Sequence, residues 1–264
     1  MATTSELVAR PTRSSALSLA TRAARRVTSL GATVGDLLLR DAQARAGGSP
    51  TARARARASA AALQRTMQEL CETHGVFVDA VGLSRLPLGP AVFVANHLGY
   101  LDPIIIGAHV RVSPIAKAEI ADWPVVGARA RALGVNFVRR GNPHSGAVAL
   151  RRAARALGAG VSVLNFPEGT TTRGETVLPF SRGIFGVARL LGVPVVPLRL
   201  DFRDRDVAWV GDATFLPHYL RTASRSVVRA RLAVGHPIPA MAERDASTLA
   251  RLARFVILSE LAPS

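Results

Sequence analysis

Two residues five positions apart, His97 and Asp102, form the first group that can carry out chemistry. They follow an apolar run, Ala91–Ala95, that is typical of a strand, and strand ends in an open parallel sheet border a crevice. The His97 imidazole can take a proton from a hydroxyl near neutral pH. Asp102, brought back by the turn through Gly99, can hold the other ring N–H and fix the tautomer. This pair is therefore a candidate general base with its orienting carboxylate.

Asp102 also has a purely structural interpretation. Pro103 suits the first position of a helix, and the apolar residues 104–106 continue it, so Asp102 is in place to cap that helix. The two roles are compatible because a carboxylate has two oxygens.

A second group of polar residues follows another apolar run and extends from Phe166 to Glu175. Glycines such as Gly169 allow backbone N–H groups to approach a ligand closely. Glu168, Thr170 and Arg173 add an acceptor, a hydroxyl and a cation, which together suit an oxygen-rich head group. The alternative is an ordinary turn with a threonine-rich tip.

Several common catalytic sites have no sequence signature in this chain. We find no phosphate-binding loop, no His-Glu-x-x-His, no Gly-x-Ser-x-Gly and no dinucleotide-type glycine fingerprint. The single cysteine, Cys71, excludes an intrachain disulfide framework and a zinc site built from cysteines, and it fits a reducing compartment. Nucleotide hydrolysis, zinc proteolysis and ordinary serine-esterase chemistry therefore lack support.

The charge balance predicts a polyanionic partner. The chain has 264 residues, with 34 basic and 18 acidic side chains and a net charge of +16. Nucleic acid, an anionic membrane face and a phosphorylated substrate all fit this charge. However, Lys117 is the only lysine, and such an arginine bias is also typical of a GC-rich genome. Aromatic residues make up only 5%, which argues against base stacking on a single-stranded nucleic acid, so we expect no nucleic-acid partner.

Alternating elements predict an α/β fold with a mainly parallel sheet flanked by helices. Helical spacing indicates helices at 51–73 and 145–157. Short apolar runs typical of buried strands occur at 76–81, 91–95, 135–138, 161–166 and 193–200. The longest uncharged run, 86–101, is interrupted by prolines and glycines and is shorter than the roughly 18 apolar residues of a membrane span. We predict no transmembrane helix.

Three regions are expected along the chain: a basic N-terminal region at 1–50, a leading helix at 51–75, and the main domain at 76–264. Within the first, apolar residues recur every three or four positions from Leu17 to Leu37, while Arg22, Arg25, Arg26 and Arg40 lie largely off that stripe. Such a helix can lie in a membrane interface. It can equally dock on the main domain, and part of the region is expected to be flexible.

The spacing of these residues resembles the glycerophospholipid acyltransferase family, typified by 1-acylglycerol-3-phosphate acyltransferase. Four family blocks occur in order, and residues 117–120 and 123–124 between them are also similar. The blocks are His-x-x-x-x-Asp at His97 and Asp102, aromatic-aliphatic-x-Arg at Phe137, Val138 and Arg140 after Gly134, Phe-Pro-Glu-Gly-Thr at Phe166 to Thr170, and Val-Pro-x-x-Pro at Val193 to Pro197.

The resemblance implies transfer of a fatty acyl group from acyl-CoA or acyl carrier protein to the free hydroxyl of a lysolipid. It implies His97 as general base, Asp102 as its orienter and Arg140 as a phosphate contact. The acceptor-binding turn would be Glu168, Gly169 and Thr170, with Lys117 and Arg173 as further substrate contacts. A thioester is already activated, so neither a metal nor a bound cofactor is expected. The expected location is peripheral or monotopic, on the cytoplasmic face of a membrane.

The third block departs from the phosphatidate-forming pattern in one respect that bears on the acceptor. Arginine usually follows Glu-Gly-Thr directly, but here Thr171 and Thr172 precede Arg173. The first expectation for the acceptor is 1-acylglycerol-3-phosphate, and the alternative is a lysophospholipid or lyso-ornithine lipid. Arg139 stands where the family often has aspartate, which keeps an anionic acceptor plausible. A non-catalytic protein that binds anionic membranes or nucleic acid is the alternative of another class.

Overall fold

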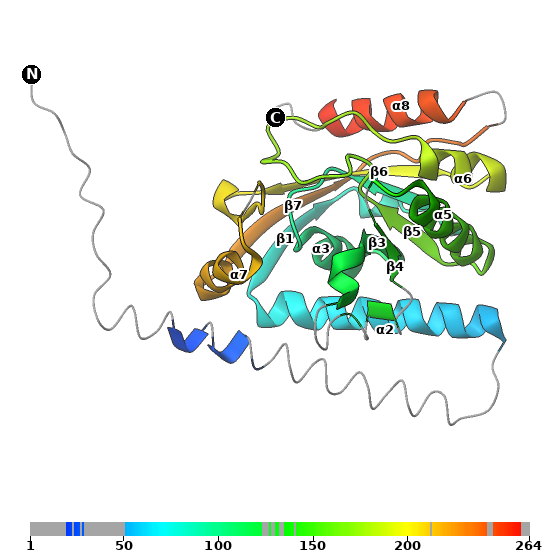
Figure 1. Ribbon diagram of the computed structural model, residues 1–264. Coiled ribbons are helices and arrows are strands. Elements are labelled where there is room, and N and C mark those ends of the chain that lie inside the picture. Colours follow the sequence, from blue (N-terminus) through cyan, green and yellow to red (C-terminus); the bar gives the residue numbers. More distant parts are fainter. Residues whose placement is uncertain are drawn as a thin grey trace, which may run out of the picture.

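The computed structural model describes residues 20–22, 24–26, 28, 51–122, 127, 130–131, 135–139, 141–211, 213–241 and 245–259. Its centre is a seven-stranded sheet with helices on both faces (Figure 1). The strands are β1 (Val76–Val81), β2 (Val92–Ala95), β3 (Val112–Lys117), β4 (Asn136–Val138), β5 (Ser162–Asn165), β6 (Val195–Phe202) and β7 (Val228–Val234).

The strand order in the sheet is β1-β7-β6-β2-β5-β3-β4. The five strands from β6 to β4 run parallel to one another. β7 is antiparallel to β6 and parallel to β1, so β1 and β7 run opposite to the other five strands. The prediction of a mainly parallel sheet flanked by helices is confirmed.

Helices cover the two faces of the sheet as separate layers, and Figure 1 shows α2 and α8 on opposite sides. One layer contains α2 (Ala52–Thr73) and α3 (Asp102–His109), and the other contains α5 (Pro143–Gly158), α6 (Gly183–Leu191) and α8 (Ala246–Ser259). A further helix, α7 (Phe215–Ser224), precedes β7. Every residue of β2 is buried because its side chains alternate between the two cores.

The packing of α2 follows from the spacing of its apolar residues. Ala60, Leu63, Met67 and Cys71 recur every three or four positions and are its buried residues. Thr51 caps the helix by accepting a hydrogen bond from the backbone N–H three residues on. The contact with α3 is close, since a Cβ added to Gly107 would lie 1.9 Å from the Met67 sulfur. A side chain at Gly107 would therefore require Met67 to move.

The expected helices and strands agree with the structure to within two residues. The sequence analysis did not identify β3, β7, α6, α7 or α8. In the part of the chain that is described, no helix is long and apolar enough to cross a membrane.

The N-terminal region is described only between residues 20 and 28, where it is helical. The Arg26 side chain is buried and donates hydrogen bonds to backbone oxygens at the ends of α2 and α7, including Thr73 O at 3.1 Å and Ala223 O at 2.9 Å. Ala20 and Ala24, which belong to the predicted apolar stripe, are exposed. Arg22 and Arg26 therefore face the body of the protein, whereas Arg25 is exposed. The remaining residues of the predicted stripe lie outside the described residues.

Candidate active site

The histidine of the first block lies at the carboxyl end of a central strand. β2 pairs with β5 on one side and with β6 on the other, and His97 follows it after one residue, Asn96. The Asn96 side chain is fully buried, donating to Leu200 O and accepting from Leu200 N, both at 2.8 Å. These two hydrogen bonds to β6 fix the end of β2 and thereby the start of the His97 turn.

His97 and Asp102 contact each other directly, as the sequence predicted. The ring Nδ1 lies 2.7 Å from Asp102 Oδ2. Because a carboxylate accepts hydrogen bonds, Nδ1 donates to Asp102, and in the neutral ring the lone pair is then on Nε2. The ring stacks on Phe166, with 4.3 Å between centroids, and its side chain is 14% exposed. An oriented imidazole with a free lone pair is in the state that a general base requires.

Asp102 also organises the turn before it. Its Oδ2 accepts hydrogen bonds from the backbone N–H groups of Leu98 at 2.5 Å and Gly99 at 2.9 Å. The side chain is fully buried, and among the described residues its Oδ1 has no hydrogen-bond partner. The helix-cap interpretation is wrong: Asp102 is the first residue of α3, Leu101 is its N-cap, and the carboxylate binds the preceding turn.

The loop between β5 and α6, residues 166–182, contains the third block and contacts His97 from a second direction. Glu168 accepts from the backbone N–H of His97 through Oε1 and from that of Leu178 through Oε2, both at 2.8 Å. Burial raises the pKa of Glu168, and the hydrogen bonds from these two backbone N–H groups oppose that rise. Both carboxylate oxygens thus accept hydrogen bonds from backbone N–H groups. Binding of a head group by Glu168 stays a prediction.

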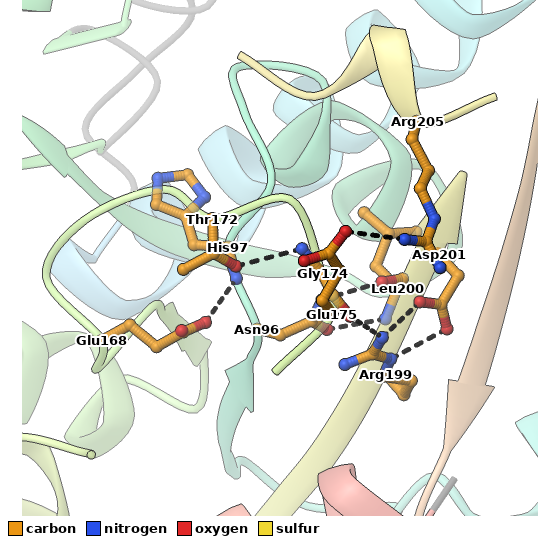
Figure 2. A network of polar contacts seen from close by, with 10 residues as sticks. All are labelled: Asn96, His97, Glu168, Thr172, Gly174, Glu175, Arg199, Leu200, Asp201 and Arg205. Atoms are coloured by element: carbon orange, nitrogen blue, oxygen red, sulfur yellow. Dashed lines mark hydrogen bonds and ion pairs between the residues drawn. The ribbon is translucent and has the colours of Figure 1, made fainter. Parts of the chain in front are cut away.

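A second hydrogen bond joins this loop to His97. Thr172 N donates to His97 O at 2.8 Å, so the β5–α6 loop binds both the N–H and the carbonyl of that residue (Figure 2). Gly169, Thr170 and Arg173 are exposed. Gly169 has a positive φ of 72°, as the turn at the tip requires. These three residues are open to a ligand, and their role stays a prediction.

The second block includes residues of β4 and continues past its carboxyl end, on the side of the sheet where β2 and β5 also end. Arg140 and Gly134 lie outside the described residues, so the structure gives no position for the predicted phosphate contact. Lys117 is the last residue of β3, and it is exposed at that edge. Beside β4 lies a cavity of about 510 Å³ lined in part by Arg131, Phe137, Arg139 and Arg152. His97 does not line this cavity, which is nevertheless suited to an anion by its three arginines.

The fourth block does not line the site. Val195 and Val196 begin β6 and are fully buried in the two cores. A polar network further along the same strand was not predicted. In it, Arg199 pairs with Asp201 and donates a hydrogen bond to the β5–α6 loop at Gly174 (Figure 2). A charged residue within the apolar run of β6 was the available signal.

An aromatic cluster borders the His97 turn on the α7 side. Trp209 N donates to Leu98 O at 2.8 Å, and the Tyr100 ring packs against Trp209. Burial raises the pKa of Tyr100 to about 12. His218 donates through Nε2 to Ala208 O and accepts from the Tyr100 hydroxyl through Nδ1, each at 3.2 Å. This cluster supports the turn, and the sequence analysis did not identify it.

Comparison with known proteins identifies related sequences. The model of the family described as Acyltransferase matches residues 77–201. The lyso-ornithine lipid O-acyltransferase of Pseudomonas aeruginosa is 32% identical over 176 residues, covering 65% of this chain and 67% of that protein. A chloroplastic 1-acyl-sn-glycerol-3-phosphate acyltransferase of Brassica napus is 36% identical over 125 residues, 46% of this chain and 36% of that protein.

A solved structure has the same fold. The crystal structure of the 1-acyl-sn-glycerophosphate (LPA) acyltransferase from Thermotoga maritima aligns with a TM-score of 0.68, covering 95% of this chain and 99% of that one. The two sequences are 19% identical, so this likeness concerns the fold.

Proposed function

The chain belongs to the Acyltransferase family and is an O-acyltransferase that acts on lysolipids, and from this premise we propose the site, the donor and the acceptor. The enzyme moves a fatty acyl group from acyl-CoA or acyl carrier protein to the free hydroxyl of the lysolipid. His97 is the general base and Asp102 is its orienter. The observation that carries this proposal is the 2.7 Å contact between Nδ1 and Oδ2 at the end of β2.

The reaction needs one proton transfer and one displacement. His97 Nε2 removes the hydroxyl proton while the alcohol oxygen attacks the thioester carbonyl carbon. The carbon–sulfur bond breaks, and the imidazolium returns the proton to the departing thiolate. Asp102 stabilises the imidazolium because its carboxylate already accepts the Nδ1–H.

Transfer is direct, without an acyl-enzyme. The single cysteine, Cys71, is buried on α2, and burial raises the pKa of its thiol to about 11, so it is a poor nucleophile. A thioester donor is already activated, and holding both substrates in line supplies much of the remaining acceleration. Either donor is polyanionic, which suits a chain with a net charge of +16.

The acceptor we propose first is a lyso-ornithine lipid. In this chain Thr171 and Thr172 follow Glu-Gly-Thr, where the phosphatidate-forming pattern has arginine. The Pseudomonas aeruginosa relative, which is named for that lipid, also aligns over more of this chain than the Brassica napus relative does. An ornithine head group offers a carboxylate, which arginine binds well.

The second candidate acceptor is 1-acylglycerol-3-phosphate, the first expectation from the sequence. It is favoured by the cavity beside β4, because Arg131, Arg139 and Arg152 suit a phosphate more than an amino acid. Arg140, directly after Arg139, is the proposed phosphate contact.

We also propose that the enzyme works at an anionic membrane face. Arg22 donates to Ser224 O, and Arg26 is buried against α2 and α7, so these two arginines face the body of the protein. Ala20, Ala24 and Arg25 are exposed, and the two alanines belong to the predicted stripe that extends to Leu37. An exposed apolar stripe with arginines beside it is suited to insertion among acyl chains at an anionic surface.

One experiment tests donor and acceptor together. The protein is incubated with acyl-CoA or acyl carrier protein and with separate lysolipids: lyso-ornithine lipid, 1-acylglycerol-3-phosphate and lysophosphatidylethanolamine. Thiol release gives the rate, and mass spectrometry identifies the acylated product. The proposal expects product on lyso-ornithine lipid at the highest rate. Product on 1-acylglycerol-3-phosphate alone selects the second acceptor, and no product on any lysolipid with either donor contradicts the proposed function.

A further inference from the structure

The network behind the β5–α6 loop centres on Arg199, a residue of β6 with a side chain that is only 1% exposed. Its Nε donates to Asp201 Oδ2 at 2.8 Å, and its Nη2 donates to Asp201 Oδ1, so the two side chains form a fork. Among the described residues, the buried Nη1 has no hydrogen-bond partner. Arginine does not lose its charge in a protein, so burying the guanidinium lowers the stability of the fold through desolvation.

The same guanidinium reaches into the β5–α6 loop. Arg199 Nη2 donates to Gly174 O at 2.8 Å, a contact visible in Figure 2. Gly174 has a positive φ of 81°, which favours glycine, and a Cβ there would lie 3.0 Å from Leu98 Cδ2. The loop therefore packs directly on the residue that follows His97.

Two steps of hydrogen bonding connect Gly174 to His97. Gly174 N donates to Thr172 Oγ1 at 3.3 Å, and Thr172 N donates to His97 O at 2.8 Å. Glu168, earlier in the same loop, holds the His97 N–H. Asn96 fixes β2 to β6 at Leu200, next to Arg199, so both ends of this connection are set by the same pair of strands.

We propose that Arg199 is a positioning residue for the acyl transfer: by binding Gly174 it keeps Thr172 and Glu168 on the backbone of His97. Its hydrogen bonds go to Asp201 and Gly174 and none goes to His97, so it acts through the loop. This inference rests on the proposed function for its kinetic consequences, while its structural part does not depend on which substrates the enzyme uses.

The test compares Arg199→Gln with Arg189→Gln, an exposed arginine on α6 that serves as the matched control. Hydrogen exchange is followed at the amides of His97 and Thr172, and at the amides of β7 as a reference for global stability. We expect exchange at the two loop-contact amides to rise at least about tenfold in Arg199→Gln, with β7 unchanged and with no effect in the control. This readout requires no substrate.

The kinetic consequence is a fall in kcat with little change in KM, because the loop positions the base and the variant removes no substrate contact. We expect kcat to fall about 10- to 100-fold in Arg199→Gln and to recover partly in Arg199→Lys, which restores the charge without the fork. If Arg199→Gln does not fold, Gly174→Ala perturbs the same contact from the loop side.

Three outcomes overturn the inference: unchanged exchange at His97 and Thr172, an equal rise in exchange throughout β7, or a normal kcat in a variant with a released loop. A wild-type enzyme without acyl transfer contradicts the proposed function instead, and leaves the exchange result to be judged by itself.

Discussion

Replacing Asp102 with asparagine tests whether the charge of this carboxylate supports His97 as the base. In the structure, Oδ2 accepts three N–H groups, from His97 Nδ1, Leu98 and Gly99. An asparagine oxygen in the place of Oδ2 can still accept all three, with the amide nitrogen in the place of Oδ1. His97 would keep its place and its tautomer, and would lose the negative charge that stabilises the imidazolium.

The structure gives different magnitudes for rate and stability. Losing the carboxylate charge weakens stabilisation of the imidazolium by about 1.5–3 kcal/mol, or roughly 10- to 150-fold in kcat at 1.36 kcal/mol per tenfold. The two backbone bonds change from charge-assisted to neutral, and we expect the free energy of unfolding to fall by about 2 kcal/mol in total. Such a loss is smaller than the stability of a typical domain, so the variant should remain folded at 25 °C.

The assay is thiol release at saturating donor and acceptor, with urea denaturation of the same samples. Asp79→Asn, an exposed aspartate on β1, is the matched control and should behave like the wild type in both measurements. A folded Asp102→Asn enzyme that retains more than about a third of the wild-type kcat would refute the argument that the Asp102 charge stabilises the imidazolium.

Three further predictions follow from the contacts of single residues. Glu168→Gln places an amide N–H against a backbone N–H of His97 or Leu178, and it should lower the free energy of unfolding by about 1–3 kcal/mol in urea titrations. Its kcat should fall with an acceptor KM within about threefold, whereas a large rise in KM would assign Glu168 to the head group. Cys71, buried and with its pKa raised to about 11, should resist a thiol reagent at pH 8 until the protein is unfolded, and fast labelling of the native protein would contradict this. Burial lowers the pKa values of His74 and His218 below the unfolded value of 6.5, so the unfolded state binds more protons and stability should fall as the pH drops below 6.5. His74→Gln should reduce that fall between pH 7.5 and 5.5 in urea titrations, and an unchanged pH dependence would exclude His74 as a contributor.

The sequence predicts five strands, β1, β2, β4, β5 and β6, because they are short and mostly apolar. Two strands were missed for opposite physical reasons. β3 contains Ser113 and Pro114, which interrupt its apolar run. In β7, exposed Arg229 and Arg231 alternate with buried residues, since one face of this strand is open to solvent. A search for alternation in addition to apolar runs would have found β7.

The site shows the same division between local and distant information. His97 and Asp102 are five residues apart, and a turn after a strand brings them together, so sequence spacing was sufficient. Thr172 contacts His97 across 75 positions, and Arg199 contacts Gly174 across 25. These contacts depend on the order of strands in the sheet, which the sequence did not supply. A charged residue in a buried strand was the local sign that such a partner exists.

The N-terminal helix shows that arginines outside an apolar stripe can be the residues that pack on the protein. The sequence places Arg22, Arg25 and Arg26 off the stripe, and in the structure Arg25 is exposed while the other two contact backbone carbonyls. In the structure the Arg26 guanidinium is buried because it meets backbone carbonyls at the ends of α2 and α7, where the helix dipoles favour a cation. The apolar pattern could be recognised in the sequence. The backbone carbonyls that accept hydrogen bonds from these arginines could not.

The central claim is that one imidazole removes the proton from the lipid hydroxyl during acyl transfer. It is tested most directly by the rate of thiol release from His97→Ala relative to the wild type, at saturating donor and acceptor and with both proteins shown to be folded. We predict a loss of at least about 100-fold, because general-base catalysis contributes about 10²- to 10⁴-fold. Equal rates in the two proteins would contradict the account.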